Sequence, residues 1–172
     1  MTATAPSLDA SWERFEALYR SSRDDVYAYV ATLLRDRAAA EDVTALAFER
    51  AYRRRRTFDR RRGDERAWLF GIARNAALDE LRRRKRHLAL VREPLDTPGD
   101  APAEDAEEAT LRRTTVRAAL DALTPREREL VALKFHAGLS NGEIARVLGV
   151  SESNAGTLLH RTIAKLRSSC HA

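Results

Sequence analysis

The sequence predicts an all-α protein of two small helical domains, joined by a flexible acidic linker, with a helix-turn-helix in the C-terminal domain. Three observations support this fold class. Apolar residues recur at helical spacing along most of the 172 residues, and no stretch alternates as a half-buried strand does. Charged residues make up 33% of the chain and aromatic residues only 6%, while Gly and Pro number 7 and 5, which suits amphipathic helices. The stretch Leu95–Ala109 is rich in Pro, Ala and acids and cannot bury much apolar surface.

The first domain is expected to comprise residues 10–92 and three helices. Residues 57–66 break the helical periodicity and contain Gly63, so they are expected to form a loop. Trp68 lies on the apolar face of the third helix, where we expect a core aromatic. The expected helices run from about Ser11 to Leu34 (as one helix or two abutting ones), from Ala38 to Arg55, and from Ala67 into the basic run Arg82–Arg86.

The second domain is expected to comprise residues 111–170, after a linker at 93–110. A first helix is expected near Leu111–Ala122. Thr124 can cap a second helix that runs from Pro125 to about His136. Glu127, three residues after Thr124, completes a capping box, and Pro125 suits the first helical position.

The residues from Leu139 to Leu166 predict two helices that are joined by a tight turn and cross at a steep angle. Ser140 and Glu143 form a second capping box, Gly149 suits the sharp turn, and Ser151 can cap the following helix. This is the pattern of a helix-turn-helix, whose second helix enters the major groove of DNA. A plain pair of antiparallel helices is the alternative. The outward positions of the second helix are expected to be Glu152, Ser153, Asn154, Gly156, Thr157, His160 and Arg161.

The charge distribution favours a polyanionic partner. The net charge is +5, but residues 10–92 hold 21 basic and 13 acidic residues, and residues 110–172 hold ten basic and five acidic. Between them, residues 93–109 hold seven acids and no base. Two basic domains flanking an acidic strip suit binding to nucleic acid. The arginine runs 53–56, 60–62 and 82–86 are therefore interpreted as phosphate contacts rather than as solvated surface.

The sequence offers little for catalysis, metal binding or membrane insertion. The four histidines are scattered, and neither a phosphate-binding glycine loop nor a nucleophile elbow is present. The acidic pairs Asp24–Asp25 and Glu41–Asp42 are interpreted as helix-start charge and solvated surface. Cys170 is a lone cysteine, which fits a reducing cytoplasm. We expect a cytoplasmic protein that is not an enzyme and has no cofactor, metal, signal peptide or membrane insertion.

The order of these features resembles the ECF (extracytoplasmic function) group of bacterial RNA polymerase sigma factors, over about Phe15 to Arg167. The first domain carries Ala40-Glu41-Asp42-Val43, Phe48-Glu49-Arg50-Ala51-Tyr52, Arg66-Ala67-Trp68-Leu69-Phe70-Gly71-Ile72-Ala73-Arg74-Asn75 and Leu78-Asp79-Glu80-Leu81-Arg82-Arg83. The second carries Leu123-Thr124-Pro125-Arg126-Glu127-Arg128, Gly138-Leu139-Ser140-Asn141-Gly142-Glu143-Ile144-Ala145, Leu148-Gly149-Val150-Ser151 and Leu159-His160-Arg161.

The resemblance implies that the protein binds core RNA polymerase and directs it to promoter DNA. The helix Asp42–Arg50 would bind the polymerase clamp, through Asp42, Ala45, Leu46, Glu49 and Arg50. The loop Phe58–Arg66 would hold a flipped-out base of the minus-ten element, and the third helix would read the duplex beside it. The minus-ten residues implied in this way are Phe58, Arg60, Arg61, Arg62, Asn75, Asp79, Arg82 and Arg83. The minus-thirty-five residues are Ser151, Ser153, Asn154, Thr157, His160 and Arg161.

Two departures from the family pattern stand out. Ala45-Leu46 replace a polar pair of the clamp-binding helix, so Leu46 is expected to lie in a surface that binds a partner. The alternative is that Ala45-Leu46 pack against the first helix and that the two domains dock on each other. Gly156 and Leu158 lie where a basic residue is common, and Gly156 costs about 1 kcal/mol of helix stability.

The resemblance also implies that the second domain touches the polymerase flap and that the linker threads toward the catalytic cleft. We expect a monomer when free, and a helical anti-sigma partner that covers apolar surface around Leu46 and the helix Leu130–Leu133. The alternative function is a stand-alone helix-turn-helix regulator whose first domain senses a ligand or dimerises.

Overall fold

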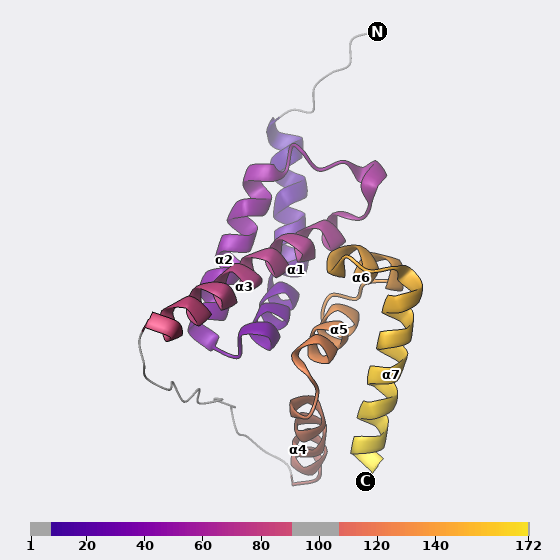
Figure 1. Ribbon diagram of the computed structural model, residues 1–172. Helices are drawn as coiled ribbons and strands as arrows, with labels where there is room; N and C mark the ends of the chain where they lie inside the picture. Colours follow the sequence, from indigo (N-terminus) through magenta and orange to yellow (C-terminus); the bar gives the residue numbers. More distant parts are fainter. Residues whose placement is uncertain (1–7, 91–106, 172) are drawn as a thin grey trace.

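The computed structural model describes residues 8–90 and 107–171, and within them every regular element is helical (Figure 1). The expected all-α fold is confirmed. The elements are α1 (Leu8–Leu34), α2 (Arg37–Arg54), the 3-10 turn η1 (Arg60–Arg62), α3 (Glu65–Leu90), α4 (Glu107–Asp121), α5 (Pro125–Phe135), α6 (Asn141–Leu148) and α7 (Glu152–His171).

Helices α1, α2 and α3 pack against one another and form the first lobe. Its interior is lined by apolar side chains that recur along each helix, and Tyr29 and Phe70 meet there edge to face with ring centroids 5.4 Å apart. The first predicted helix is a single helix. The predicted loop is present and contains the turn η1, where the Asp59 side chain accepts a hydrogen bond from the Arg61 N–H at 2.9 Å.

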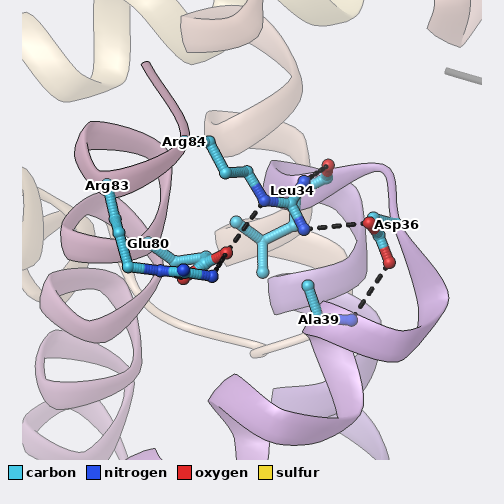
Figure 2. A network of polar contacts seen from close by, with 6 residues as sticks. All are labelled: Leu34, Asp36, Ala39, Glu80, Arg83 and Arg84. Carbon is cyan, nitrogen blue, oxygen red and sulfur yellow. Dashed lines mark hydrogen bonds and ion pairs between the residues drawn. The ribbon is translucent and has the colours of Figure 1, made fainter. Parts of the chain in front are cut away.

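The expectation that the third helix ends in the run Arg82–Arg86 is wrong, because α3 continues to Leu90. Arginine and lysine are good helix formers. Figure 2 shows two of these arginines bonded to Glu80, one turn earlier in α3: Arg83 by 2.8 and 2.9 Å, and Arg84 by 2.9 Å. Pairs at this spacing stabilise a helix. The basic run therefore extends the helix instead of ending it.

Arg84 also ties α3 to the turn between α1 and α2 (Figure 2). Its guanidinium donates to the Asp36 carboxylate at 2.9 Å and to the Leu34 carbonyl at 3.4 Å. Asp36 caps α2 by accepting from the Ala39 N–H at 3.0 Å, and that hydrogen bond, together with Arg84, lowers the pKa of the Asp36 carboxyl. Arg84 is thus a structural residue, and its positive charge is already partnered.

The second lobe contains α4 to α7, and the predicted caps are confirmed. Both capping boxes are formed, Thr124 with Glu127 at the start of α5 and Ser140 with Glu143 at the start of α6. Gly149 ends α6 in the left-handed conformation with φ 68°, as the sharp turn requires. These local hydrogen bonds set α6 and α7 as the two helices of a helix-turn-helix.

The predicted linker lies mostly outside the described residues, because the structure gives no account of residues 91–106. Helix α4 begins at Glu107, inside the range 93–110 that the composition assigns to the linker.

The two lobes pack against each other through α5 on α1 and α6 on α3 (Figure 1). Their buried apolar side chains form one continuous cluster. Leu130 and Leu133 lie in that cluster with 1% and 0% exposure, so the prediction that they form an uncovered partner surface is wrong. The apolar face of α5 is covered from within the chain.

Candidate nucleic-acid interface

The outer face of α7 is the most regular polar surface of the second lobe. Ala155 and Leu159 are buried against the other helices, which leaves the opposite side of α7 in solvent. Ser151 is committed to capping, since its hydroxyl accepts from the Asn154 N–H at 3.2 Å. The predicted residues that share the exposed face, at helical spacing, are Ser153, Asn154, Thr157, His160 and Arg161. Polar side chains on the second helix of a helix-turn-helix can reach base edges in a major groove.

A second surface is a hollow of about 460 Å³ between the loop after α2 and the start of α3. Phe58 and Trp68 lie beside it in contact, with ring centroids 5.2 Å apart and the ring planes tilted by 46°. Asn75, Arg62 and Arg54 add an amide and two guanidiniums to its lining. Aromatic faces beside cations suit an unstacked base and its phosphate. The structure thus gathers Phe58, Arg62 and Asn75, which the sequence assigned to one site.

The other predicted minus-ten residues lie around this hollow rather than in its lining. Arg60 and Arg61 are exposed in η1. Asp79 has two arginine partners, Arg50 of α2 at 3.2 Å and Arg82 at 3.4 Å. Arg83, 70% exposed, pairs with Glu80 and lowers the pKa of that carboxyl, an effect to which Arg84 adds. The Arg82–Asp79 pair is exposed on both sides, so Arg82 can exchange it for a phosphate at small cost, whereas the partner of Arg83, Glu80, is only 13% exposed.

The predicted clamp residues share one face of α2. Asp42, Ala45 and Glu49 are exposed, at spacings of three and four residues. Leu46 and Arg50 are half-buried. Leu46 packs partly against the core, so the alternative that this side chain packs within the chain holds in part. Beside Glu49 lies an aromatic hollow of about 240 Å³, lined by Trp12, Phe15, Tyr19, Phe48, Glu49 and Tyr52. The face is a mixed polar and apolar strip of the kind that binds another protein.

Arg66 joins the two lobes where α5 ends. Its Nε donates to the Ala137 carbonyl at 2.6 Å and its Nη2 to the His136 carbonyl at 3.3 Å, just beyond the last turn of α5. In the first lobe the same guanidinium bonds the Asp25 carboxylate at 2.6 Å and the Ser22 hydroxyl at 3.1 Å. A cation at a helix C-terminus stabilises the free carbonyls there.

Glu129 of α5 is inserted between two residues of the first lobe. Its Oε1 accepts from the Arg74 Nε at 2.6 Å and from the Tyr29 hydroxyl at 3.0 Å. The side chains of Glu129 and Arg74 are 8% and 19% exposed. Burial, and then the nearby carboxylate, raise the pKa of the Tyr29 hydroxyl, which therefore remains a donor.

Sequence reasoning missed three features of these surfaces. Trp68 is half-buried at the edge of the hollow, because the loop and α3 diverge there, and not in the core as expected. Arg146 and Val147 of α6 line the same hollow from the other lobe, and no local pattern indicates this. The position of Glu129 could have indicated a buried pair, since Glu129 precedes Leu133 by one turn on the apolar face of α5 and a buried glutamate needs a partner.

The described residues show neither a metal cluster nor a spanning helix. No three His, Cys, Asp or Glu side chains of this part of the chain gather as metal ligands. No helix among the same residues is both long and apolar enough to cross a membrane.

Two protein-family models match the chain, and together they cover most of it. Sigma-70 region 2 matches residues 18–87, and sigma-70 region 4 matches residues 113–166. The two matches coincide with the two lobes.

Several curated proteins are similar along most of the chain. ECF RNA polymerase sigma factor BldN of Streptomyces coelicolor is 36% identical over 90% of this chain, which spans 59% of its length. RNA polymerase sigma factor CarQ of Myxococcus xanthus is 34% identical over 92% of this chain and 90% of its own. ECF RNA polymerase sigma factor SigX of Bacillus subtilis is 30% identical over 90% and 82%.

Two solved structures share the fold. One is the sigma factor RpoE in complex with the anti-sigma factor NepR from Bartonella quintana, with a TM-score of 0.77, 20% identity, and 93% and 98% of the two chains covered. The other is CnrH in complex with the cytosolic domain of CnrY, with a TM-score of 0.62, 24% identity and coverage of 91% and 87%.

Proposed function

The chain belongs to the ECF group of sigma-70 factors, which bind core RNA polymerase and promoter DNA to initiate transcription, and we propose how its surfaces divide this work. Residues 10–92 would form the clamp and minus-ten domain, residues 93–110 the linker, and residues 111–170 the minus-thirty-five domain. Sigma factors are generally regulators without catalytic activity, and we propose that this chain acts as one in the cytoplasm, as a monomer when free.

The observation that carries this proposal is the hollow between the loop and α3. It combines the Phe58–Trp68 ring pair with Asn75 and two arginines, and these five residues lie in the stretch that matches sigma-70 region 2. A flipped-out minus-ten base would stack on the rings, and the exposed arginines Arg60, Arg61, Arg82 and Arg83 would hold the phosphates beside it.

The exposed face of α7 would read the minus-thirty-five element. Ser153, Asn154 and Thr157 are near its N-terminal end, which enters the groove first in helix-turn-helix proteins. Arg161 lies on the same face one turn further along and would bind a guanine edge or a phosphate. Ser151 would act indirectly, through the cap that fixes the start of α7.

The mixed face of α2 would bind the polymerase clamp, and an anti-sigma protein would compete for surfaces of this kind. RpoE and CnrH, which share the fold, were each solved with a protein partner, named as an anti-sigma factor in the case of RpoE. We propose a partner of that class for this chain as well.

A substitution on α2 tests the clamp assignment. Ala45→Arg places a large cation on the exposed face, and we expect no change in the core because Ala45 is exposed and lies outside the core cluster. We expect the variant to keep the melting temperature of the parent and to lose co-elution with core polymerase in gel filtration. Ala17→Arg makes the same change at an exposed position of α1 and serves as the matched control. Normal co-elution of Ala45→Arg would contradict the assignment.

A further inference from the structure

We propose that the hollow between the loop and α3 is also a binding site for a small molecule, a free ribonucleoside diphosphate, which the chain binds in the absence of polymerase and DNA. The inference rests on the proposed function in one respect, since the same hollow would hold a promoter base during initiation. The ligand itself is inferred from the side chains that line the hollow.

The hollow has the size of a small-molecule site. Its volume of about 460 Å³ falls within the range of about 300–1,000 Å³ that is usual for ligand pockets. Gly71 provides part of this room, because it lies between Trp68 and Asn75 on the face of α3 that lines the hollow. A Cβ built at Gly71 would meet no atom within 4 Å. A flat ring can therefore come close to the α3 backbone at this point.

A nucleobase would find an aromatic surface and an amide in the lining. Phe58 and Trp68 are in ring contact and both are only half-buried, so ring surface remains on which a base can stack. Asn75 is exposed and offers one acceptor and two donors, which match the alternating groups on the edge of a base.

Three guanidiniums around the hollow are available to phosphate. Arg54 of α2, Arg62 of η1 and Arg146 of α6 line it, and all three are exposed. Within the part of the chain that the structure describes, none of them forms an ion pair. Arg146 donates to two backbone carbonyls, that of Arg62 at 3.0 Å and that of Gly142 at 3.4 Å. Guanidiniums without a carboxylate partner bind phosphate through charge-assisted hydrogen bonds, and three of them suit a diphosphate.

Gly63 allows Arg146 to join this set. The φ of Gly63 is +146°, and a Cβ there would overlap the Arg146 guanidinium. Arg146 belongs to the second lobe, so all three cations surround the hollow only when the lobes pack as in this structure. A free nucleotide ends at its own phosphates and can use all three, whereas a continuous strand would have to pass α6.

Two carboxylates in the lining favour a ribose over a deoxyribose. One oxygen of Asp59 accepts the Arg61 N–H at 2.9 Å, and one oxygen of Asp64 accepts the Arg66 N–H at 2.7 Å. The second oxygen of each carboxylate can accept a hydrogen bond from a ribose hydroxyl, as acidic residues do in dinucleotide-binding proteins. The lining therefore has a group for each part of a ribonucleoside diphosphate.

Binding is measured with ADP as the probe, on the full chain without polymerase or DNA. The chain has two tryptophans, so Trp12→Phe gives a parent whose fluorescence reports on Trp68 alone. We expect ADP to quench this fluorescence with one site per chain and a dissociation constant below about 1 mM. Pyrophosphate and adenosine should each bind at least about tenfold more weakly, because each lacks part of the contacts. The proposal is overturned if ADP shows no saturation at about 1 mM, or if pyrophosphate or adenosine binds as tightly as ADP.

Deoxyribose ligands test the choice of a free ribonucleotide. Both 2′-deoxy-ADP and a short oligodeoxyadenylate should bind several-fold more weakly than ADP. Equal or tighter binding of either would show that the hollow takes deoxyribose or a strand in the absence of polymerase, and would overturn the proposal.

Two pairs of variants place the ligand in the hollow. Arg146→Met should weaken ADP binding by about tenfold or more, as expected for a lost charge-assisted hydrogen bond. Arg113→Met removes an exposed arginine of α4, outside the lining, and should leave binding unchanged. Gly71→Leu should fill the space for the base and abolish binding, whereas Gly71→Ala adds a single methyl group and should have a much smaller effect. Both changes at Gly71 should keep or raise the melting temperature, because leucine and alanine are better helix formers than glycine.

Binding that survives Gly71→Leu in a folded protein, or that responds equally to Arg146→Met and Arg113→Met, would place ADP elsewhere and overturn the proposal. Run-off transcription with core polymerase reports the proposed function separately. Transcripts from a chain that does not bind ADP would refute the nucleotide site alone, whereas ADP binding without transcripts would refute the proposed function and support the site.

Discussion

Gly156, in the second turn of the proposed recognition helix, allows a stability prediction from geometry. It lies within α7, where glycine is less favourable than alanine by about 0.8–1.0 kcal/mol. A Cβ built at this position would meet the Asn141 Nδ2 at 3.5 Å, which is an ordinary van der Waals distance. No backbone strain and no overlap offset the gain, so Gly156→Ala should stabilise the protein by nearly the full propensity difference.

For a chain of this length, a gain of about 1 kcal/mol raises the melting temperature by about 2–4 °C. Urea unfolding followed by circular dichroism should show a higher midpoint with an unchanged slope. A decrease in stability would mean that the added methyl group displaces Asn141, and that the packing of α6 on α7 differs from the structure.

Gly149→Ala is the matched comparison within the same motif. A Cβ at Gly149 would meet no atom within 4 Å, but the φ of +68° at this residue is left-handed, which costs an alanine about 1–2 kcal/mol. This variant should therefore be destabilised although it creates no clash. Equal and positive effects of the two substitutions would refute the reasoning from backbone conformation.

Three further outcomes are expected. Trp68→Ala should destabilise the first lobe by about 2 kcal/mol, less than for a fully buried tryptophan, since Trp68 is half-buried beside Phe58; an unchanged melting temperature would contradict this packing. Lys165 donates to Glu127 and lowers the pKa of that carboxyl, so the pair stabilises the protein above the ordinary glutamate pKa and the effect is lost as pH falls through the lowered one. The stability difference between the parent and Lys165→Met, measured by urea unfolding, should therefore be present at neutral pH and vanish in acid. In promoter assays, Arg161→Ala should relax the preference at one minus-thirty-five position by about 1–3 kcal/mol, whereas a uniform loss over all variants would make Arg161 a phosphate contact.

Features that depend on neighbouring residues could be predicted from the sequence. The capping boxes at Thr124 and Ser140 join residues three apart, and the left-handed turn at Gly149 needs only that residue's freedom. The faces of α2 and α7 follow from helical spacing alone. The end of α3 was misplaced because a basic run was taken for a terminus, although its pairs with Glu80 stabilise a helix.

Features that join distant residues could not be predicted in this way. Glu129 meets Tyr29 and Arg74 across 100 and 55 residues of chain, and Arg146 meets Arg62 across 84. No periodicity links such positions, so the domains were expected to stand apart on a tether. A charged residue on the apolar face of α5 indicated that a partner was needed, but not where it lay.

Transcription with purified components tests the central claim most directly. Core RNA polymerase with and without this protein would be given fragments of the source genome, and run-off transcripts would be sequenced. The account predicts discrete start sites that appear only with the protein and share upstream elements at the minus-ten and minus-thirty-five positions. The protein alone should bind these fragments weakly, because each basic lobe makes few phosphate contacts. Nanomolar, sequence-specific binding by the free protein, with no new transcripts in the presence of core polymerase, would contradict it.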